Sequence, residues 1–332
     1  VVSNCNLDLD PREEVVWTPI EWTWIASVYV RVIPTLFFGL PLVAYDRDKF
    51  DPETAFEVVE RYGVTMLGAP ATALRLMAEV HSPGAYDLSS VRVLTSGGES
   101  LGEEVVDWAS SAFDGVAVHE GYGQTEANAT IGDCSALFEP RVGTMGRPMP
   151  GHDVRILDPE TAEPLDEPGA VGEIGLRRDD DPVQFAEYLG RPEATAAKRQ
   201  NGFHLTEDLG SVDADGYVTF EGRRDDVIIS SGYRIGPVEI ENALAEHEAV
   251  VAAGVIGVSH ETRGEIPKAY VVLAEGTTGS PALRRDLQSF VKERLAKYEY
   301  PRELAFVDDL PTTTTGKVRR TALEEWHESG RA

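Results

Sequence analysis

The feature that most constrains the fold is a repeated alternation of predicted helix and strand between residues 51 and 126. Three segments with helical spacing, "DPETAFEVVERYG", "ATALRLMAEV" and "GEEVVDWASSAF", are each followed by an apolar segment that reads as a strand: "VTMLGAP", "VRVLTSGGES" and "GVAVHEGYGQTE". Repeated units of this length predict a parallel sheet with helices packed on its faces. We therefore expect an α/β region.

The first of these helices has clear local signals. Asp51 is expected to cap it, with a proline at the first helical position, and Gly63 is expected to end it. Ala55, Val58 and Val59 would share the buried face.

After about residue 140 the sequence changes to short alternating strands separated by turns. The "DADG" turn at 213–216 predicts a hairpin, with Val218 and Phe220 on one face. We expect a small antiparallel β-barrel here, followed by a compact α+β unit. The predicted organisation is residues 1–140 as part of a large α/β domain, 141–224 as the barrel and 225–332 as a small mobile C-terminal domain.

One long apolar stretch precedes the first predicted helix. The segment "IASVYVRVIPTLFFGLPLVAY" is interrupted by Arg31, Pro34, Gly39 and Pro41, so it contains no uninterrupted run long enough for a membrane span. It is predicted to be buried helix and strand.

Composition limits the classes of partner and the cellular setting. The 332 residues include 57 acidic and 30 basic side chains, a formal charge of -27, and only six of the basic residues are lysines. This balance predicts a halophilic source and argues against nucleic-acid binding, which needs basic residues against phosphate. Cys5 and Cys134 fit neither a disulfide framework nor a metal site, so a cytoplasmic setting is expected. A homo-oligomer is left open.

Two segments at the ends of predicted strands contain the residue types of a ligand site. "TSGGES" at 95–100 and "HEGYGQTE" at 119–126 combine glycines with small polar residues. Ligands of open α/β sheets bind at the carboxyl edge, where both segments would end. Glycines allow a nucleotide to approach the backbone closely, and Thr125 and Glu126 could serve a phosphate and a hard cation. Taken alone, either segment is better explained as an ordinary turn.

Four motifs, taken in their order along the chain, make the functional assignment specific. "EGYGQTEAN", "GTMGRPMPGHDVRILD", "TEDLGSVDADGYVTFEGRRDDVIISSGYRIGPVEIENAL" and "LPTTTTGKVRR" resemble the adenylate-forming acyl-CoA synthetases in order and spacing. The segments "SSGYRIGP" and "KYEYPR" are most similar to the medium-chain branch. The resemblance covers the chain from about Trp17 onward. It implies that ATP and a carboxylic acid give an acyl-adenylate and pyrophosphate, and that coenzyme A then displaces AMP.

The resemblance implies a role for particular residues. Glu126 would bind Mg²⁺, Thr125 would donate to phosphate or to the acyl carboxylate, and Asp208 and Arg223 would hold the ribose. Arg234 would approach the phosphate. The residues implied to bind ATP are Gly98, Glu99, Glu120, Gly121, Tyr122, Gly123, Gln124, Thr125, Asp208, Arg223, Arg234 and Lys317. Those implied to be catalytic are Lys317, Thr125 and Arg234.

The C-terminal part is implied to move and to bind coenzyme A. Asp225 matches the hinge of the family, which rotates the small domain between an adenylating and a thioester-forming pose. The residues implied to bind coenzyme A are Ser231, Gly232, Tyr233, Arg263, Tyr300, Pro301 and Arg302.

Lys317 follows the run "DLPTTTTG". The run does not fit a phosphate loop of the G-x-x-x-x-G-K-[ST] kind, because proline occupies the position of the first glycine and valine follows the lysine. The resemblance instead implies that the Lys317 ammonium reaches the acyl carboxylate and the α-phosphate during adenylation.

Acyl preference can be read in part. Gly123 stands where the acetate-using branch has a bulky tryptophan, so the acyl pocket is expected to accept a medium-chain or branched acid, as in fatty-acid metabolism. Trp24 and "LFFG" resemble the wall of that pocket, although core packing explains Phe37 and Phe38 equally well.

The phosphate-binding loop of the family, expected upstream of Trp17, does not occur in these residues. The chain begins "VVSNCNLDLD" without an initiator methionine, so we expect an N-terminal half to be missing through truncation, a frameshift or a degenerate gene. Two alternatives to a coenzyme A ligase stay open: a noncatalytic nucleotide-binding fragment, and an adenylating enzyme with another acceptor.

Overall fold

A computed structural model describes residues 14–46, 49–80, 83–98, 101–178, 181, 183–231, 233–274, 276–312 and 318–330. The chain divides into two compact units. The first comprises Val1–Thr206 and Gly210–Phe220, and the second comprises Glu207–Leu209 and Glu221–Ala332. Each unit is considered by itself.

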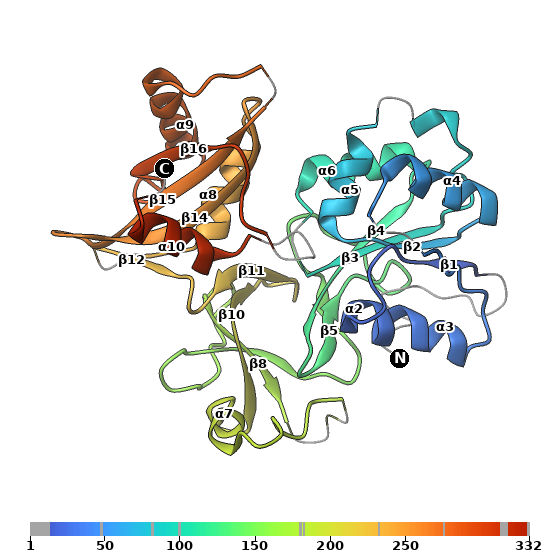
Figure 1. Cartoon of the computed structure of the whole chain (residues 1–332). Coiled ribbons are helices and arrows are strands. Elements are labelled where there is room, and N and C mark those ends of the chain that lie inside the picture. Colours follow the sequence, from blue (N-terminus) through green and yellow to red (C-terminus); the bar gives the residue numbers. More distant parts are fainter. Residues whose placement is uncertain are drawn as a thin grey trace. The chain divides into compact units, whose positions relative to one another are not determined.

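The first unit contains a six-stranded sheet whose strands lie in sequence order (Figure 1). The strands are β1 (Val16–Trp17), β2 (Met66–Gly68), β3 (Val93–Gly97), β4 (Ala117–Gln124), β5 (Asn128–Gly132) and β6 (Arg147–Pro148). Strands β1 to β4 are parallel, whereas β5 and β6 run antiparallel to their neighbours. The predicted α/β class is confirmed, and the sheet is parallel over the helix–strand repeats.

Helices α4 (Pro52–Tyr62), α5 (Ala71–Ala78) and α6 (Glu103–Ala112) cover one face of this sheet (Figure 1). The local signals of α4 act as predicted: Asp51 accepts a hydrogen bond from the Thr54 amide at 2.8 Å, and Gly63 ends the helix at φ 59°. Its expected buried face packs into the largest apolar cluster of the described residues.

The opposite face of the sheet is covered by α2 (Ile25–Ser27), a π-helical segment η1 (Val28–Val32) and α3 (Ile33–Phe37) (Figure 1). The prediction that this stretch is buried is wrong for several large side chains: Tyr29 is 56% exposed, Leu36 62% and Phe37 81%. The segment is apolar on every side, and the sheet covers only one side of it. Among the described residues, no helix is long and apolar enough to cross a membrane.

A second sheet follows, with strand order β11-β10-β8-β7 and β9 paired to β10. The strands are β7 (Val154–Leu157), β8 (Gly172–Arg177), β9 (Arg199–Gln200), β10 (Phe203–Val212) and β11 (Val218–Arg223), and the short helix α7 (Pro192–Ala197) precedes β9. The expected turn joins β10 to β11: the Asp213 amide donates to the Tyr217 carbonyl, and the Gly216 amide donates to the Asp213 carbonyl.

The second unit is an α+β unit built on β12 (Ile228–Ser230), β13 (Tyr233–Ile235), β14 (Val250–His260), β15 (Gly264–Leu273) and β16 (Glu303–Val307). Its helices are α8 (Pro237–Ala245), α9 (Pro281–Arg294) and α10 (Arg320–Glu328). Alternate residues of β14 and β15 enter two different apolar clusters, one with α8 and α9 and the other with α10. This alternation places helices on both faces of the sheet.

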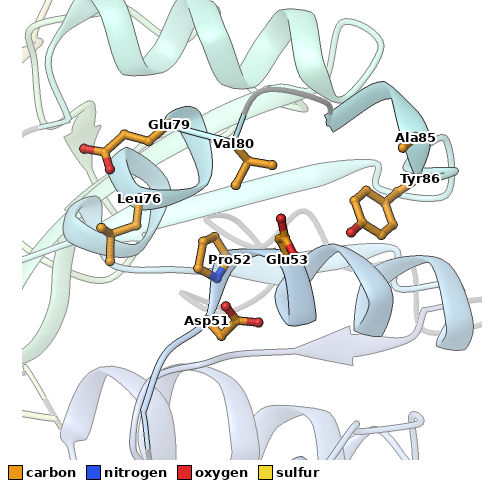
Figure 2. A pocket seen from close by; sticks show the side chains of 8 residues that line it. All are labelled: Asp51, Pro52, Glu53, Leu76, Glu79, Val80, Ala85 and Tyr86. Carbon is orange, nitrogen blue, oxygen red and sulfur yellow. The ribbon is translucent and has the colours of Figure 1, made fainter.

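A hollow lies between the start of α4, the end of α5 and the 3₁₀ turn at Pro83–Ala85 (Figure 2). Its acidic side chains are Asp51, Glu53 and Glu79, and none of the predicted ligand residues lines it. Within the described part of the chain, no three His, Cys, Asp or Glu side chains are grouped so that they could hold a metal.

The Asp51 cap gives the first prediction. Asp51→Ala should lower the free energy of unfolding by about 1 kcal/mol, because the Thr54 amide loses its acceptor at the start of α4. Chemical denaturation measures this change. Asp51→Asn keeps a side-chain oxygen and should stay close to wild type; an equal loss in both variants would contradict the capping role.

Candidate active site

The carboxyl edge of the first sheet brings the two predicted glycine-rich segments together. Strands β3 and β4 are in parallel register, with Ser96 opposite Glu120 and Gly97 opposite Gly121. Gly98 follows β3 directly, so it lies beside the segment that ends β4. Glu99 lies outside the described residues.

Two glycines at this edge are required by close backbone approach. A Cβ on Gly97 would lie 2.5 Å from the Gly121 carbonyl oxygen, and one on Gly123 would lie 1.9 Å from the Asn128 carbonyl oxygen. Real Cβ atoms do not approach backbone this closely. The backbone of β5 therefore requires a glycine at position 123, in addition to the acyl-pocket role that the sequence suggested for Gly123.

Glu120, which is half-buried, and Asp133, which is buried, form an acidic pair at the same edge. The Glu120 amide donates to the Asp133 carboxylate at 3.0 Å, and the Leu101 amide donates to the Glu120 carboxylate at 3.3 Å. Burial raises the pKa of Glu120 to about 7 and that of Asp133 to about 6. The sequence offered no signal for Asp133, because its role depends on how β4 pairs with β5.

Gln124 and Glu126 are held by residues from distant segments. The His204 ring nitrogen Nε2 lies 3.0 Å from Gln124 Oε1, and the Tyr188 hydroxyl donates to Glu126 Oε1 at 2.6 Å. Burial lowers the pKa of His204 to about 4, so its ring is neutral at pH 7. Thr125 is exposed between these two residues. Tyr188 was not foreseen, since it lies far along the chain from Glu126.

Glu126 offers the type of ligand that a hard cation prefers, a carboxylate oxygen. Its Oε1 accepts the Tyr188 hydroxyl, and no described residue donates to its Oε2 in this structure. A partly exposed carboxylate with a fixed orientation and an available oxygen suits Mg²⁺, which takes few protein ligands and retains water.

In the second unit, Arg223 links three carboxylates. Its Nε donates to Asp225 at 3.0 Å, and its two terminal nitrogens lie 3.5 Å from Asp208 and 3.4 Å from Glu207. Glu207 adopts φ 64°, which is uncommon for a residue with a side chain. The structure thus brings together the predicted ribose pair, Asp208 and Arg223, and the predicted hinge residue Asp225.

Ser231 and Arg263 meet where β12 ends and β15 begins. Arg263 donates to the Ser231 hydroxyl at 3.1 Å, and the Ser231 amide donates to the Arg263 carbonyl at 2.8 Å. Ser231 has φ 53°. Next to it, the Tyr233 ring stacks on Tyr298 with centroids 4.1 Å apart. Gly232 lies outside the described residues.

Tyr300, Pro301 and Arg302 form a second group. The Arg302 guanidinium donates to the Tyr300 hydroxyl at 2.9 Å, and the Lys292 ammonium lies 3.8 Å from the centre of the Tyr300 ring. Gln288 donates to the Pro301 and Arg302 carbonyls and so fixes the backbone of the group. The cations here suit a phosphorylated ligand.

The remaining predicted residues are described only in part. Arg234 lies in β13, opposite Ile229 of β12. Lys317 lies outside the described residues, but Thr312 bridges Val318, which closes the base of the segment that contains it.

Arg320 follows that segment and was not foreseen as important. It donates to both oxygens of Glu241 at 2.8 and 2.7 Å and to Asp226 at 3.1 Å. Its Nε donates to the Val255 carbonyl. The start of α10 is therefore tied to the residue next to Asp225.

Comparisons with known proteins agree with this arrangement. The AMP-binding enzyme family matches residues 1–180, and the C-terminal domain of AMP-binding enzymes matches residues 239–317. The chain belongs to the AMP-binding enzyme family.

The relatives within this family include acyl-CoA synthetases. The chain is 38% identical to the human mitochondrial acyl-coenzyme A synthetase ACSM4, over 96% of the chain and 55% of that protein. It is 37% identical to the uncharacterized acyl-CoA ligase YtcI of Bacillus subtilis, over 98% of the chain and 60% of that protein. The chain thus spans a little over half the length of these relatives.

Solved structures show the same fold. ATP-bound MatB from Rhodopseudomonas palustris matches with a TM-score of 0.85 and 30% identity, over 98% of this chain and 62% of that one. The amide bond synthetase McbA from Marinactinospora thermotolerans matches with a TM-score of 0.86 and 28% identity, over 98% of this chain and 64% of that one. The resemblance to adenylate-forming acyl-CoA synthetases is confirmed at the level of family and fold.

The acidic pair predicts a pH dependence of stability. The pKa of Glu120 is raised from 4.5 in its ordinary state to about 7 in the folded chain, so the folded chain binds the extra proton. The contribution of the protonated Glu120 side chain to the free energy of unfolding is complete below about pH 4.5 and is lost as the pH rises through about 7.

We expect Glu120→Gln to reduce the fall in unfolding free energy between pH 5 and pH 8 by about 2 kcal/mol. Chemical denaturation at high salt, which screens repulsion among surface carboxylates, measures this slope. Glu104→Gln removes an exposed carboxylate of α6 and should leave the slope unchanged. An unaltered slope in Glu120→Gln would refute the assignment.

Proposed function

We propose that this chain is the catalytic-lysine-containing part of an ATP-dependent acid–thiol ligase. The enzyme would activate a medium-chain or branched carboxylic acid as its acyl-adenylate and transfer the acyl group to coenzyme A. The observation that carries the proposal is the Arg223 cluster, because it joins the ribose-binding candidate Asp208 to the hinge candidate Asp225. The acyl-CoA synthetases among its relatives support the same reading.

Each half of the reaction has candidate residues. Attack of a carboxylate on the α-phosphate brings two anions together, so the site must supply positive charge and oriented donors. We assign Thr125 to donate to the reacting oxygens, Arg234 to approach the phosphate and Lys317 to neutralise the charge that develops. Asp208 would accept hydrogen bonds from the ribose hydroxyls, while the glycines of β3 and β4 would leave room for the nucleotide.

Glu126 is the residue proposed to hold Mg²⁺, which when bound would neutralise charge on the phosphates. The Tyr188 hydroxyl fixes the orientation of that carboxylate. No described residue donates to the second carboxylate oxygen in this structure, so that oxygen is the proposed metal ligand.

The second step is assigned to the C-terminal unit. Ser231, Gly232 and Tyr233 would line the passage for the thiol arm, and Arg263 with Tyr300, Pro301 and Arg302 would bind the phosphates of coenzyme A. Rotation about Asp225 would exchange the two sets of residues. The organisation into residues 1–140, 141–224 and 225–332, the cytoplasmic setting, the halophilic source and the role in fatty-acid metabolism belong to the same proposal.

A second candidate function is adenylation with an acceptor other than coenzyme A. It is favoured by the match to the solved amide bond synthetase at 28% identity. Thioester formation in the presence of coenzyme A separates the two functions, and a noncatalytic fragment would bind nucleotide without releasing pyrophosphate.

Lys317 gives the decisive variant. Lys317→Ala should abolish pyrophosphate release from ATP and acid, because the ammonium that neutralises the negative charge of the adenylation transition state is lost. Thioester formation from supplied acyl-adenylate should persist. The two half-reactions are measured separately, with Lys49→Ala as the control for loss of a surface lysine. Equal loss of both halves would count against a role confined to adenylation.

A further inference from the structure

Arg31 is a buried cation on the sheet face that α2, η1 and α3 cover. It lies in the π-helical segment η1 and is 4% exposed. Its side chain crosses Gly68 so closely that a Cβ on this glycine would lie 1.7 Å from the Arg31 Nε. Short π-helical segments are rare and often occur at functional sites. Here the absence of a side chain at Gly68 allows the Arg31 side chain to pack against the backbone of β2.

The hydrogen bonds of Arg31 are incomplete. Its Nη2 donates to the Thr95 hydroxyl at 2.8 Å, and its Nη1 donates to the Ala26 carbonyl. The buried Nε has no hydrogen-bond partner, and no carboxylate among the described residues pairs with the side chain. Although burial lowers its pKa to about 10, the guanidinium stays charged at pH 7.

The hydrogen bonding of Arg31 differs from that of Arg320. Arg320 is also largely buried, but it is paired with Glu241 and Asp226 and its Nε donates to a carbonyl. An unpaired buried charge costs several kcal/mol relative to a paired one. Arg31 therefore has the features of a group whose anionic partner comes from a ligand.

The location of Arg31 connects it to the candidate active site. Gly68, Thr95 and His119 lie opposite one another on β2, β3 and β4, so they form one row on a single face of the sheet. Arg31 contacts this row at Gly68 and at Thr95. Thr95 precedes Gly98 by three residues, which places Arg31 about 10 Å from the carboxyl edge along the strand.

Strand β5, which lies beside β4 on the side away from β3, adds a further buried polar group. It lies next to η1, and its register with β4 shifts between Tyr122 and Gly123, which leaves Thr130 as the extra residue of a bulge. The Thr130 hydroxyl is fully buried and has no hydrogen-bond partner. Bulges of this kind are frequent next to active sites.

We propose that Arg31 forms the far end of the acyl pocket and binds a second carboxylate on the substrate, so that the preferred acid is a medium-length dicarboxylic acid. This inference rests on the proposed function, because the first carboxylate of the substrate must reach the adenylating residues at the sheet edge. The second carboxylate would accept hydrogen bonds from the Arg31 guanidinium. Thr95 is the positioning residue that orients the guanidinium.

The chemistry favours a dicarboxylate over an acid with a plain alkyl tail. An alkyl tail would leave the guanidinium buried without a counterion, whereas a carboxylate matches its planar donors. A charged hydrogen bond of this type contributes about 1.5 to 3 kcal/mol, which is roughly a tenfold to hundredfold preference.

The test compares suberate, its monomethyl ester and octanoate, which have chains of the same length. Equilibrium binding to the wild-type chain is measured by calorimetry, and pyrophosphate release with ATP is measured in parallel. We expect suberate to bind at least tenfold more tightly than the other two. The ester keeps the carbon chain, removes the second charge and adds one methyl group, whereas octanoate removes the charge without added bulk, so the two comparisons together need no variant.

Arg31→Met should then remove the preference for suberate and leave octanoate unchanged or improved. Arg31→Lys keeps the charge and should retain part of the preference. Circular dichroism checks that both variants are folded; if Arg31→Met does not fold, the comparison of suberate with its ester in the wild-type chain decides.

The outcomes are distinguishable. Octanoate binding and turnover equal to or better than those of suberate would overturn the role of Arg31 and leave the proposed ligase function intact. A preference for suberate that survives in Arg31→Met would also overturn it. Absence of binding and of pyrophosphate release for all three acids would reject the proposed function together with this inference.

Discussion

The parallel pairing of β2, β3 and β4 is the constraint on which the first unit depends. Because the strands run in the same direction, their carboxyl ends meet at one edge, and Gly98 reaches the segment from Glu120 to Thr125. The same register aligns Gly68, Thr95 and His119 across one face. One set of backbone hydrogen bonds thus fixes both the edge where a nucleotide could approach and the polar row beneath Arg31.

Sequence signals were sufficient where structure is decided locally. Helix α4 begins at Asp51 and ends at Gly63 as predicted, because capping and left-handed termination depend on adjacent residues. The apolar stretch from Ile25 to Phe38 was predicted to be buried, yet Phe37 is largely exposed. A segment that is apolar on all sides does not reveal which side another element will cover, since its periodicity is the same for every face.

The candidate site was predicted as a list of residues, but not as a set of interactions. The resemblance supplied Glu126 and Arg223, whereas their partners Tyr188 and Glu207 appear only in the structure. Such contacts join residues far apart in sequence or depend on an uncommon backbone conformation, and no local pattern encodes them. The acidic pair of Glu120 and Asp133 is of the same kind, because its elevated pKa values arise from strand pairing and burial.

The arginines of this acidic chain separate structural from ligand-binding roles. With 57 acidic residues, a carboxylate is seldom far from any cation, and Arg320 and Arg223 are each paired with more than one. Arg31 is more deeply buried than either, and the described part of the chain supplies no carboxylate for it. Within the described part of the chain, the Arg31 guanidinium contacts Gly68, Thr95 and Ala26, which are all neutral, so its charge is the one to which we assign an anionic ligand.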